Sequence, residues 1–155
     1  LTIENTLFDV EGHAEILSAE EKDGRLSATV ETTSLYFGKL TKVTRTATIT
    51  ENDDLEIVDH VEVGDDDVDL RWSFVTTANP VSEPEGIILR KGEKSMVLQT
   101  TAPNAEYVVW PSDPTAYNTP ISKYEQPIKG FSIAGYTFSL KAGEKVDIVT
   151  TLKRK

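Results

Sequence analysis

Apolar and polar residues alternate with a period of two along most of the chain. Valine, isoleucine, threonine and aromatic residues recur in short runs bounded by glycine, aspartate, asparagine and proline, which is typical of half-buried β-strands. Because no stretch shows a helical period, the pattern predicts an all-β fold, a sandwich of two antiparallel sheets with about ten or more short strands. The predicted strands are Thr2–Val10, Ala14–Ala19, Arg25–Thr32, Val43–Thr50, Leu55–Val63, Val68–Val75, Gly86–Leu89, Ser95–Thr100, Tyr107–Trp110, Phe131–Leu140 and Lys145–Leu152.

Turn signals separate these runs. Asp23-Gly24 in "EKDGRL" suits a type I′ hairpin turn, which needs positive φ at both central positions, and "KAGEK" (Lys141–Lys145) is predicted to be a second hairpin turn. The segment Trp110–Gly130 breaks the strand pattern with four prolines. Proline lacks the backbone donor of a strand, and irregular segments of this length are usually functional or form interfaces.

One charge stands in each of two otherwise apolar strand faces within "VTRTATITENDDLEIVDHVEV" (Val43–Val63). If Ile49 pairs with Leu55 across the intervening turn, Arg45 falls directly opposite Asp59. A charge on an apolar face is costly unless it is paired, and opposed strand residues are close enough to pair. We therefore predict an inward-facing Arg45–Asp59 ion pair, favouring a structural role that sets the register over a ligand-binding arginine.

Three consecutive aspartates lie in "VEVGDDDVDLRW" (Val61–Trp72), between two alternating runs. A calcium loop of the EF-hand type places its oxygen ligands at alternating positions and has a glycine at the sixth. Asp65, Asp66 and Asp67 are consecutive and lack that glycine, and adjacent strand residues point to opposite sides. A solvated turn is therefore favoured over weak calcium binding.

Composition narrows the function classes. The net charge of -10 argues against nucleic acid, which needs clustered Lys and Arg, and no apolar run approaches the ~20 residues of a membrane-spanning helix. Cysteine is absent, which removes disulfides and thiolate chemistry. His13 and His60 are expected to be solvated surface residues, and zinc would need three or four converging ligands. We expect no catalytic residue, no metal and no cofactor.

Two stretches hold the residues that could contact a sugar or another domain. Aromatic rings stack on sugar rings but also dominate protein interfaces, and burial or an interface is the favoured interpretation here. The locally basic run "SLYFGKLTKVTR" (Ser34–Arg45) would receive an anionic sugar, although an ordinary exposed strand is favoured. Trp72 alternates with apolar neighbours and is expected in the core. The candidates are Tyr36, Lys39, Lys42, Trp110, Tyr117 and Tyr124.

The stretch from Thr32 to Val63, which includes the basic run and the predicted ion pair, resembles part of a known family. "TTSLYFGKLTKVTRTATITENDDLEIVDHVEV" resembles the C-terminal β domain of heparinase II/III-like polysaccharide lyases. Thr33, Tyr36, Arg45 and Asp59 stand where that family has an Asp-x-Thr…Tyr element, an Arg opening one strand and an Asp late in the next. "LTIEN" and "LRWSFVTTANP" resemble the strand that opens the domain and its Trp-containing strand. Glu31 departs from the usual Asp.

The resemblance implies stacked antiparallel sheets that pack against an upstream α/α toroid. In the family, the toroid holds the catalytic Tyr and most substrate contacts, and the lyase abstracts the proton α to a uronate carboxyl group before β-elimination. A family His would lie upstream of Leu1, and the zinc ligands of some members are not evident here. The resemblance thus implies an accessory domain that is not active alone.

We therefore expect residues 1–155 to form a single β-sandwich domain excised from the C-terminal part of a larger chain. Its expected partners are the toroid of the same protein and an acidic polysaccharide such as a glycosaminoglycan, with no nucleic acid and no membrane. The expected location is periplasmic or extracellular, in a bacterium. The alternatives are an independent carbohydrate-binding module and a purely structural or adhesive sandwich without a ligand.

Overall fold

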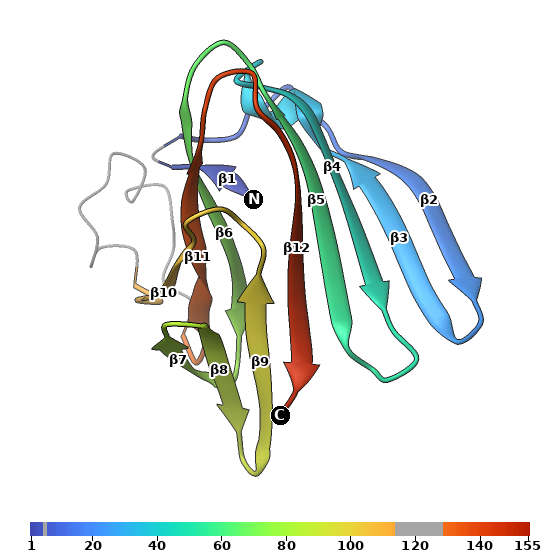
Figure 1. The fold of residues 1–155 in the computed structure, drawn as a ribbon, viewed down its shortest axis with the longest axis vertical. Coiled ribbons are helices and arrows are strands. Elements are labelled where there is room, and N and C mark those ends of the chain that lie inside the picture. Colours follow the sequence, from blue (N-terminus) through green and yellow to red (C-terminus); the bar gives the residue numbers. More distant parts are fainter. Residues whose placement is uncertain (5, 114–128) are drawn as a thin grey trace.

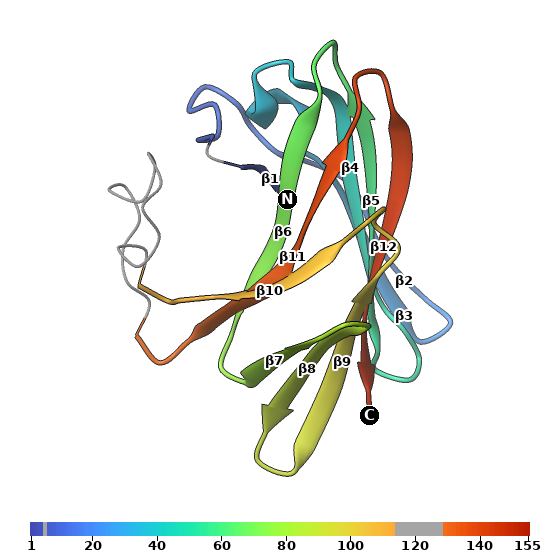
Figure 2. The same ribbon diagram turned by 60° about the vertical axis from the view of Figure 1, so that its left-hand side comes forward.

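The chain folds into two antiparallel sheets that pack face to face, as the alternating pattern predicts (Figures 1 and 2). The computed structural model describes residues 1–4, 6–113 and 129–155. In spatial order, the four-stranded sheet contains β1 (Thr2–Ile3), β6 (Val68–Thr76), β11 (Ser132–Leu140) and β10 (Glu106–Trp110). The eight-stranded sheet contains β2 (Glu15–Lys22), β3 (Arg25–Glu31), β4 (Leu40–Ile49), β5 (Leu55–Val63), β12 (Lys145–Arg154), β9 (Lys94–Thr100), β8 (Gly86–Lys91) and β7 (Asn79–Glu83).

The core lies between the facing sides of the two sheets. Alternate residues of each strand point inward, so burying them removes apolar surface from water at ~25 cal/mol per Å². Residues with no more than 2% of their surface exposed include Leu40, Val43, Val61, Leu70, Trp72, Ile87, Leu98, Ala134, Tyr136, Leu140 and Ile148. No helix in the described part of the chain is long and apolar enough to cross a membrane.

The two predicted turns have different outcomes. At the tip of the β2–β3 hairpin, Asp23 and Gly24 have φ of 51° and 73°, as a type I′ turn requires. The prediction of a hairpin at Lys141–Lys145 is wrong, because β11 and β12 belong to different sheets. The local sequence cannot distinguish a turn that pairs two strands from one that carries the chain between sheets.

The aspartate run is a second crossing between the sheets, from β5 to β6. Asp67 ties it to the first crossing: its carboxylate accepts hydrogen bonds from Lys141 Nζ (2.7 Å) and the Ala142 amide (3.0 Å). The Gly143 amide donates to the carbonyl of Gly64 (2.9 Å). The run therefore holds two inter-sheet turns together at one end of the sandwich.

Two strands differ markedly from the sequence prediction. The first strand covers only Thr2–Ile3, since the chain then leaves the sheet toward a short 3₁₀-helix, η1 (Thr33–Tyr36). Strand β7 was not predicted, because Pro80 disfavours a strand; β7 is an edge strand, where proline is tolerated. The prolines at 114, 120 and 127 lie outside the described residues.

Candidate functional site

Arg45 and Asp59 form a fork-shaped ion pair inside the sandwich. Strands β4 and β5 pair Ile49 with Leu55 and Arg45 with Asp59, the register that the sequence predicts. Arg45 Nε lies 2.7 Å from Asp59 Oδ1, and Nη2 lies 2.9 Å from Oδ2. Only 1% of the Asp59 side chain is exposed, against 29% for Arg45. The bidentate geometry is the strongest that an arginine and a carboxylate can form.

Trp72 brings the opposite sheet to this pair. Its indole Nε1 donates to Asp59 Oδ2 over 3.0 Å, and the Arg45 Cζ lies 5.7 Å from its ring centroid. The other side of the network is aromatic: Trp72 stacks on Tyr136, whose hydroxyl lies 2.6 Å from Thr150 Oγ1. Both Asp59 oxygens thus accept hydrogen bonds from Arg45, and Oδ2 also accepts one from Trp72, as the predicted register-setting pair would require.

Burial sets the electrostatics of this centre. It raises the pKa of Tyr136 to about 12, so the phenol stays neutral and donates or accepts a hydrogen bond at ordinary pH. Burial disfavours the charged guanidinium of Arg45, but the hydrogen bond and charge of Asp59 outweigh it and raise the pKa of Arg45. The guanidinium of Arg45 therefore keeps its positive charge although it is half-buried.

The structure buries Tyr36, one of the candidates for contact with a sugar or another domain. Tyr36 ends η1 and is 5% exposed. Its hydroxyl donates to the carbonyl of Leu1 (2.9 Å), and Phe8 packs on its ring edge. Burial raises the pKa of Tyr36. Tyr36 lies in a 3₁₀ turn that places its ring against the core rather than toward solvent.

The basic stretch is partly neutralised by a neighbouring strand. Lys42 Nζ lies 2.8 Å from Glu31 Oε1, which also accepts from Thr33 Oγ1 (2.9 Å). These hydrogen bonds, that of Lys42 first, lower the pKa of Glu31. Lys39 is exposed. The sequence shows no acid between Ser34 and Arg45, but antiparallel pairing of β3 with β4 brings one there.

Trp110 meets a residue that the sequence analysis did not single out. It ends β10 half-buried, and the guanidinium of Arg71 lies over its ring, with Cζ 4.1 Å from the centroid. The sequence offers one signal for Arg71: it is a cation placed between two predicted core residues, Leu70 and Trp72, so it must point to the opposite face of the strand. Tyr117 and Tyr124, the other aromatic candidates, lie outside the described residues.

His60 is paired rather than simply solvated. Its Nδ1 lies 2.7 Å from Asp147 Oδ1 on β12, and its Nε2 lies 3.3 Å from Glu62 Oε1. The hydrogen bond to Asp147, and then that to Glu62, raises the pKa of His60. The outward parity was predicted correctly, but the acid on the neighbouring strand was not.

We expect His60 to make the free energy of unfolding depend on pH. A pKa raised in the folded state stabilises the fold below the histidine pKa of the unfolded chain, and this contribution is lost as pH rises through the folded-state pKa. His60→Gln should flatten this part of the pH profile of urea denaturation. The effect should be small and should shrink in high salt, because the pair is exposed. An NMR titration that puts the pKa of His60 at or below that of a free histidine would contradict this.

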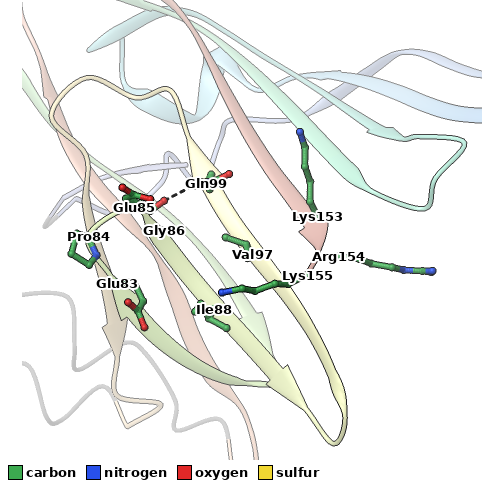
Figure 3. A pocket seen from close by; sticks show the side chains of 10 residues that line it. All are labelled: Glu83, Pro84, Glu85, Gly86, Ile88, Val97, Gln99, Lys153, Arg154 and Lys155. Carbon is green, nitrogen blue, oxygen red and sulfur yellow. Dashed lines mark hydrogen bonds between the residues drawn. The ribbon is translucent and has the colours of Figure 1, made fainter.

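A pocket of about 580 Å³ lies on the eight-stranded sheet, where the β7–β8 turn, β9 and the C-terminal end of β12 meet (Figure 3). Its floor is Ile88 and Val97, and Figure 3 shows Lys155 extending toward them while Arg154 points away. Gln99 Nε2 bridges to the carbonyl of Glu85 (3.3 Å). The lining contains no nucleophile beside a base, and no three His, Cys, Asp or Glu side chains in the described part of the chain are grouped as metal ligands.

Comparison with known proteins gives a likeness of fold. No family model and no curated protein matches the sequence. The structure is similar to that of heparinase III, with a TM-score of 0.63, 13% identity and 91% of this chain covered. It is equally similar, with a TM-score of 0.63 and 10% identity, to the heparan sulfate lyase HepC from Pedobacter heparinus. The chain spans only 21% of the length of either protein, so it matches part of each.

Proposed function

We propose that this chain is the C-terminal accessory domain of a heparinase II/III-like polysaccharide lyase and is not active alone. The observation that carries the proposal is the match of 91% of this chain to about a fifth of two lyases, in the fold that the sequence resemblance implied. The chemistry is consistent with it, because the buried Asp59 carboxylate already accepts hydrogen bonds from Arg45 and Trp72. Proton abstraction would then belong to the rest of the enzyme.

An uncovered apolar face supports a partner domain. Strands β2 and β3 extend beyond the four-stranded sheet (Figure 1), yet most of their core-side residues are apolar, with Glu21, level with Leu26, as the charged exception. Ile16 lies in register, through Val30 and Arg45, with buried Asp59, but it is 74% exposed, and Leu26 and Ile49 are 49% and 45% exposed. Contiguous exposed apolar surface commonly marks an interaction site. We assign this face to the upstream toroid.

The proposed substrate is a uronate-containing polysaccharide, cleaved in the periplasm or outside a bacterial cell. The alternative is an independent carbohydrate-binding module, for which the aromatic platform at Trp110 is the favourable observation. It is less well supported, because the uncovered face carries aliphatic side chains rather than the aromatic rings on which sugars stack.

The proposal is tested by a lyase assay on the full-length product of the gene and on this 155-residue chain. With heparan sulfate as substrate, the full-length protein should release unsaturated uronate products, which absorb in the ultraviolet, and the isolated chain should release none. Activity in the isolated chain would contradict the accessory role. A full-length protein that is inactive on heparan sulfate, hyaluronan and chondroitin would contradict the lyase assignment.

A further inference from the structure

Arg71 and Trp110 lie together on the outer face of the four-stranded sheet. Their neighbours Leu70, Trp72 and Tyr107 point into the core, so the alternation of a strand places Arg71 and Trp110 outside. Register puts them on a diagonal: Arg71 is level with Thr137 of β11, whereas Trp110 is level with Ile133.

Gly135 occupies the position between these two levels. It pairs with Ser73 on one side and Val108 on the other. With no side chain on this part of β11, the arm of Arg71 and the ring of Trp110 can meet over the middle strand, and the guanidinium lies 4.1 Å from the ring centroid. The stacking holds the guanidinium in a fixed orientation.

The charge of Arg71 is not neutralised by the described residues. None of their carboxylates forms an ion pair with it, and its Nε is buried without a hydrogen-bond partner. Glu106 is level with Arg71 across β11, yet the guanidinium lies over Trp110 instead. In a chain with 26 acidic and 16 basic residues, a half-buried cation with no acid beside it among residues 1–4, 6–113 and 129–155 is unusual, since such groups are normally paired.

We propose that Arg71 and Trp110 form a binding site for the anionic group of an acidic oligosaccharide, a uronate carboxylate or a sulfate. A stacked guanidinium presents its edge as a fork of donors that matches two oxygens of such a group. Val75, 47% exposed, and Ile133 lie on the same face and offer an apolar surface beside the fork for the sugar ring. That the ligand is a saccharide depends on the proposed function, whereas that it carries an anionic group is inferred from Arg71 alone.

The surrounding charges limit this site to a local contact. Asp69 lies two positions from Arg71 on the same face and accepts a hydrogen bond from Ser139 Oγ (2.6 Å), and Glu106 lies on the same end of the sheet. The net charge of -10 repels a long polyanion. Binding should therefore be weak, should involve one or two sugar units, and should not follow the total charge of the ligand.

The test is an NMR titration of the isotope-labelled chain with three hexasaccharides: one from heparan sulfate, one from hyaluronan and neutral maltohexaose. The acidic sugars should shift the Arg71 Nε–H and Trp110 indole signals, and maltohexaose should not. Shifts with hyaluronan identify a carboxylate as sufficient; shifts confined to heparan sulfate identify a sulfate. No shift with either acidic sugar, or equal shifts with maltohexaose, would overturn the proposal.

Variants of Arg71 test whether binding needs the paired hydrogen-bond donors of its guanidinium or only a positive charge. Arg71→Met keeps the length of the arm and should weaken binding at least about tenfold, the loss expected for charge-assisted hydrogen bonds; Arg71→Lys should recover little of it. Arg25→Met is the matched control and should bind normally, because Arg25 is exposed at the start of β3 in the other sheet. Equal weakening by both methionine variants would overturn the proposal. The lyase assay does not depend on this result, so the two proposals can fail separately.

Discussion

Replacing Asp59 with alanine is expected to lower the free energy of unfolding by about 3–5 kcal/mol. The substitution leaves Arg45 without its counter-charge in a half-buried position and removes the acceptor of the Trp72 indole. Because Trp72 belongs to the other sheet, the loss also removes a polar link between the two halves of the sandwich. Urea denaturation followed by tryptophan fluorescence measures the change.

Two further variants make the Asp59 prediction specific. Arg45→Met combined with Asp59→Leu removes both charges and should cost much less than Asp59→Ala, since no unpaired charge remains. Lys145→Ala breaks an exposed pair with Glu62 (2.6 Å) and should change little. If Asp59→Ala destabilises no more than Lys145→Ala, the buried pair is not the structural centre that its geometry indicates.

Gly135→Ala is expected to destabilise the chain by about 3–5 kcal/mol, in the range of the most severe single substitutions. A Cβ at this position would overlap the backbone carbonyl of Trp72 and would lie 2.8 Å from the Ser73 Cα. Backbone atoms in the centre of a sheet cannot move aside as a flexible side chain can. The strands β6 and β11 would have to separate at the middle of the four-stranded sheet.

Gly143→Ala is the matched control for the glycine prediction. Gly143 has φ of +74° in an exposed turn, and a Cβ there would meet nothing within 4 Å. Its substitution should cost roughly 1–2 kcal/mol, the penalty of a left-handed backbone. Thermal and urea unfolding of the two variants should therefore differ clearly. Equal losses would mean that backbone conformation, rather than the close approach of two strands, explains the glycine at 135.

The period-two pattern was sufficient for the fold class because it reports which side of each strand is buried. It also predicted the Arg45–Asp59 register, since a one-residue slip would expose the whole apolar set. It failed where the pairing of a segment depends on strands distant in sequence rather than on its own residues. The Lys141–Lys145 turn has the composition of a hairpin, and Pro80 hides an edge strand whose neighbour supplies the pairing.

The candidate site was harder to predict than the fold, because contacts between strands distant in sequence decide it. The sequence places Lys42 in a locally basic stretch, but in the structure β3 places Glu31 beside it. Trp110 was found from its residue type, but its partner Arg71 comes from a different strand of the sheet. That Arg71 has no acidic partner among the described residues is a property of the assembled surface and cannot be read from the local sequence.

The order of strands in the larger sheet has a consequence for how the chain folds. Residues 15–63 and 79–100 form two blocks of this sheet, and among the described strands β12 is the one that hydrogen-bonds to both, through β5 and β9 (Figure 1). It is also the last of these strands in sequence order. Pairing between segments so far apart in sequence is slow to form. The two blocks of the sheet are therefore expected to stay unjoined until β12 has been synthesised and can pair with both.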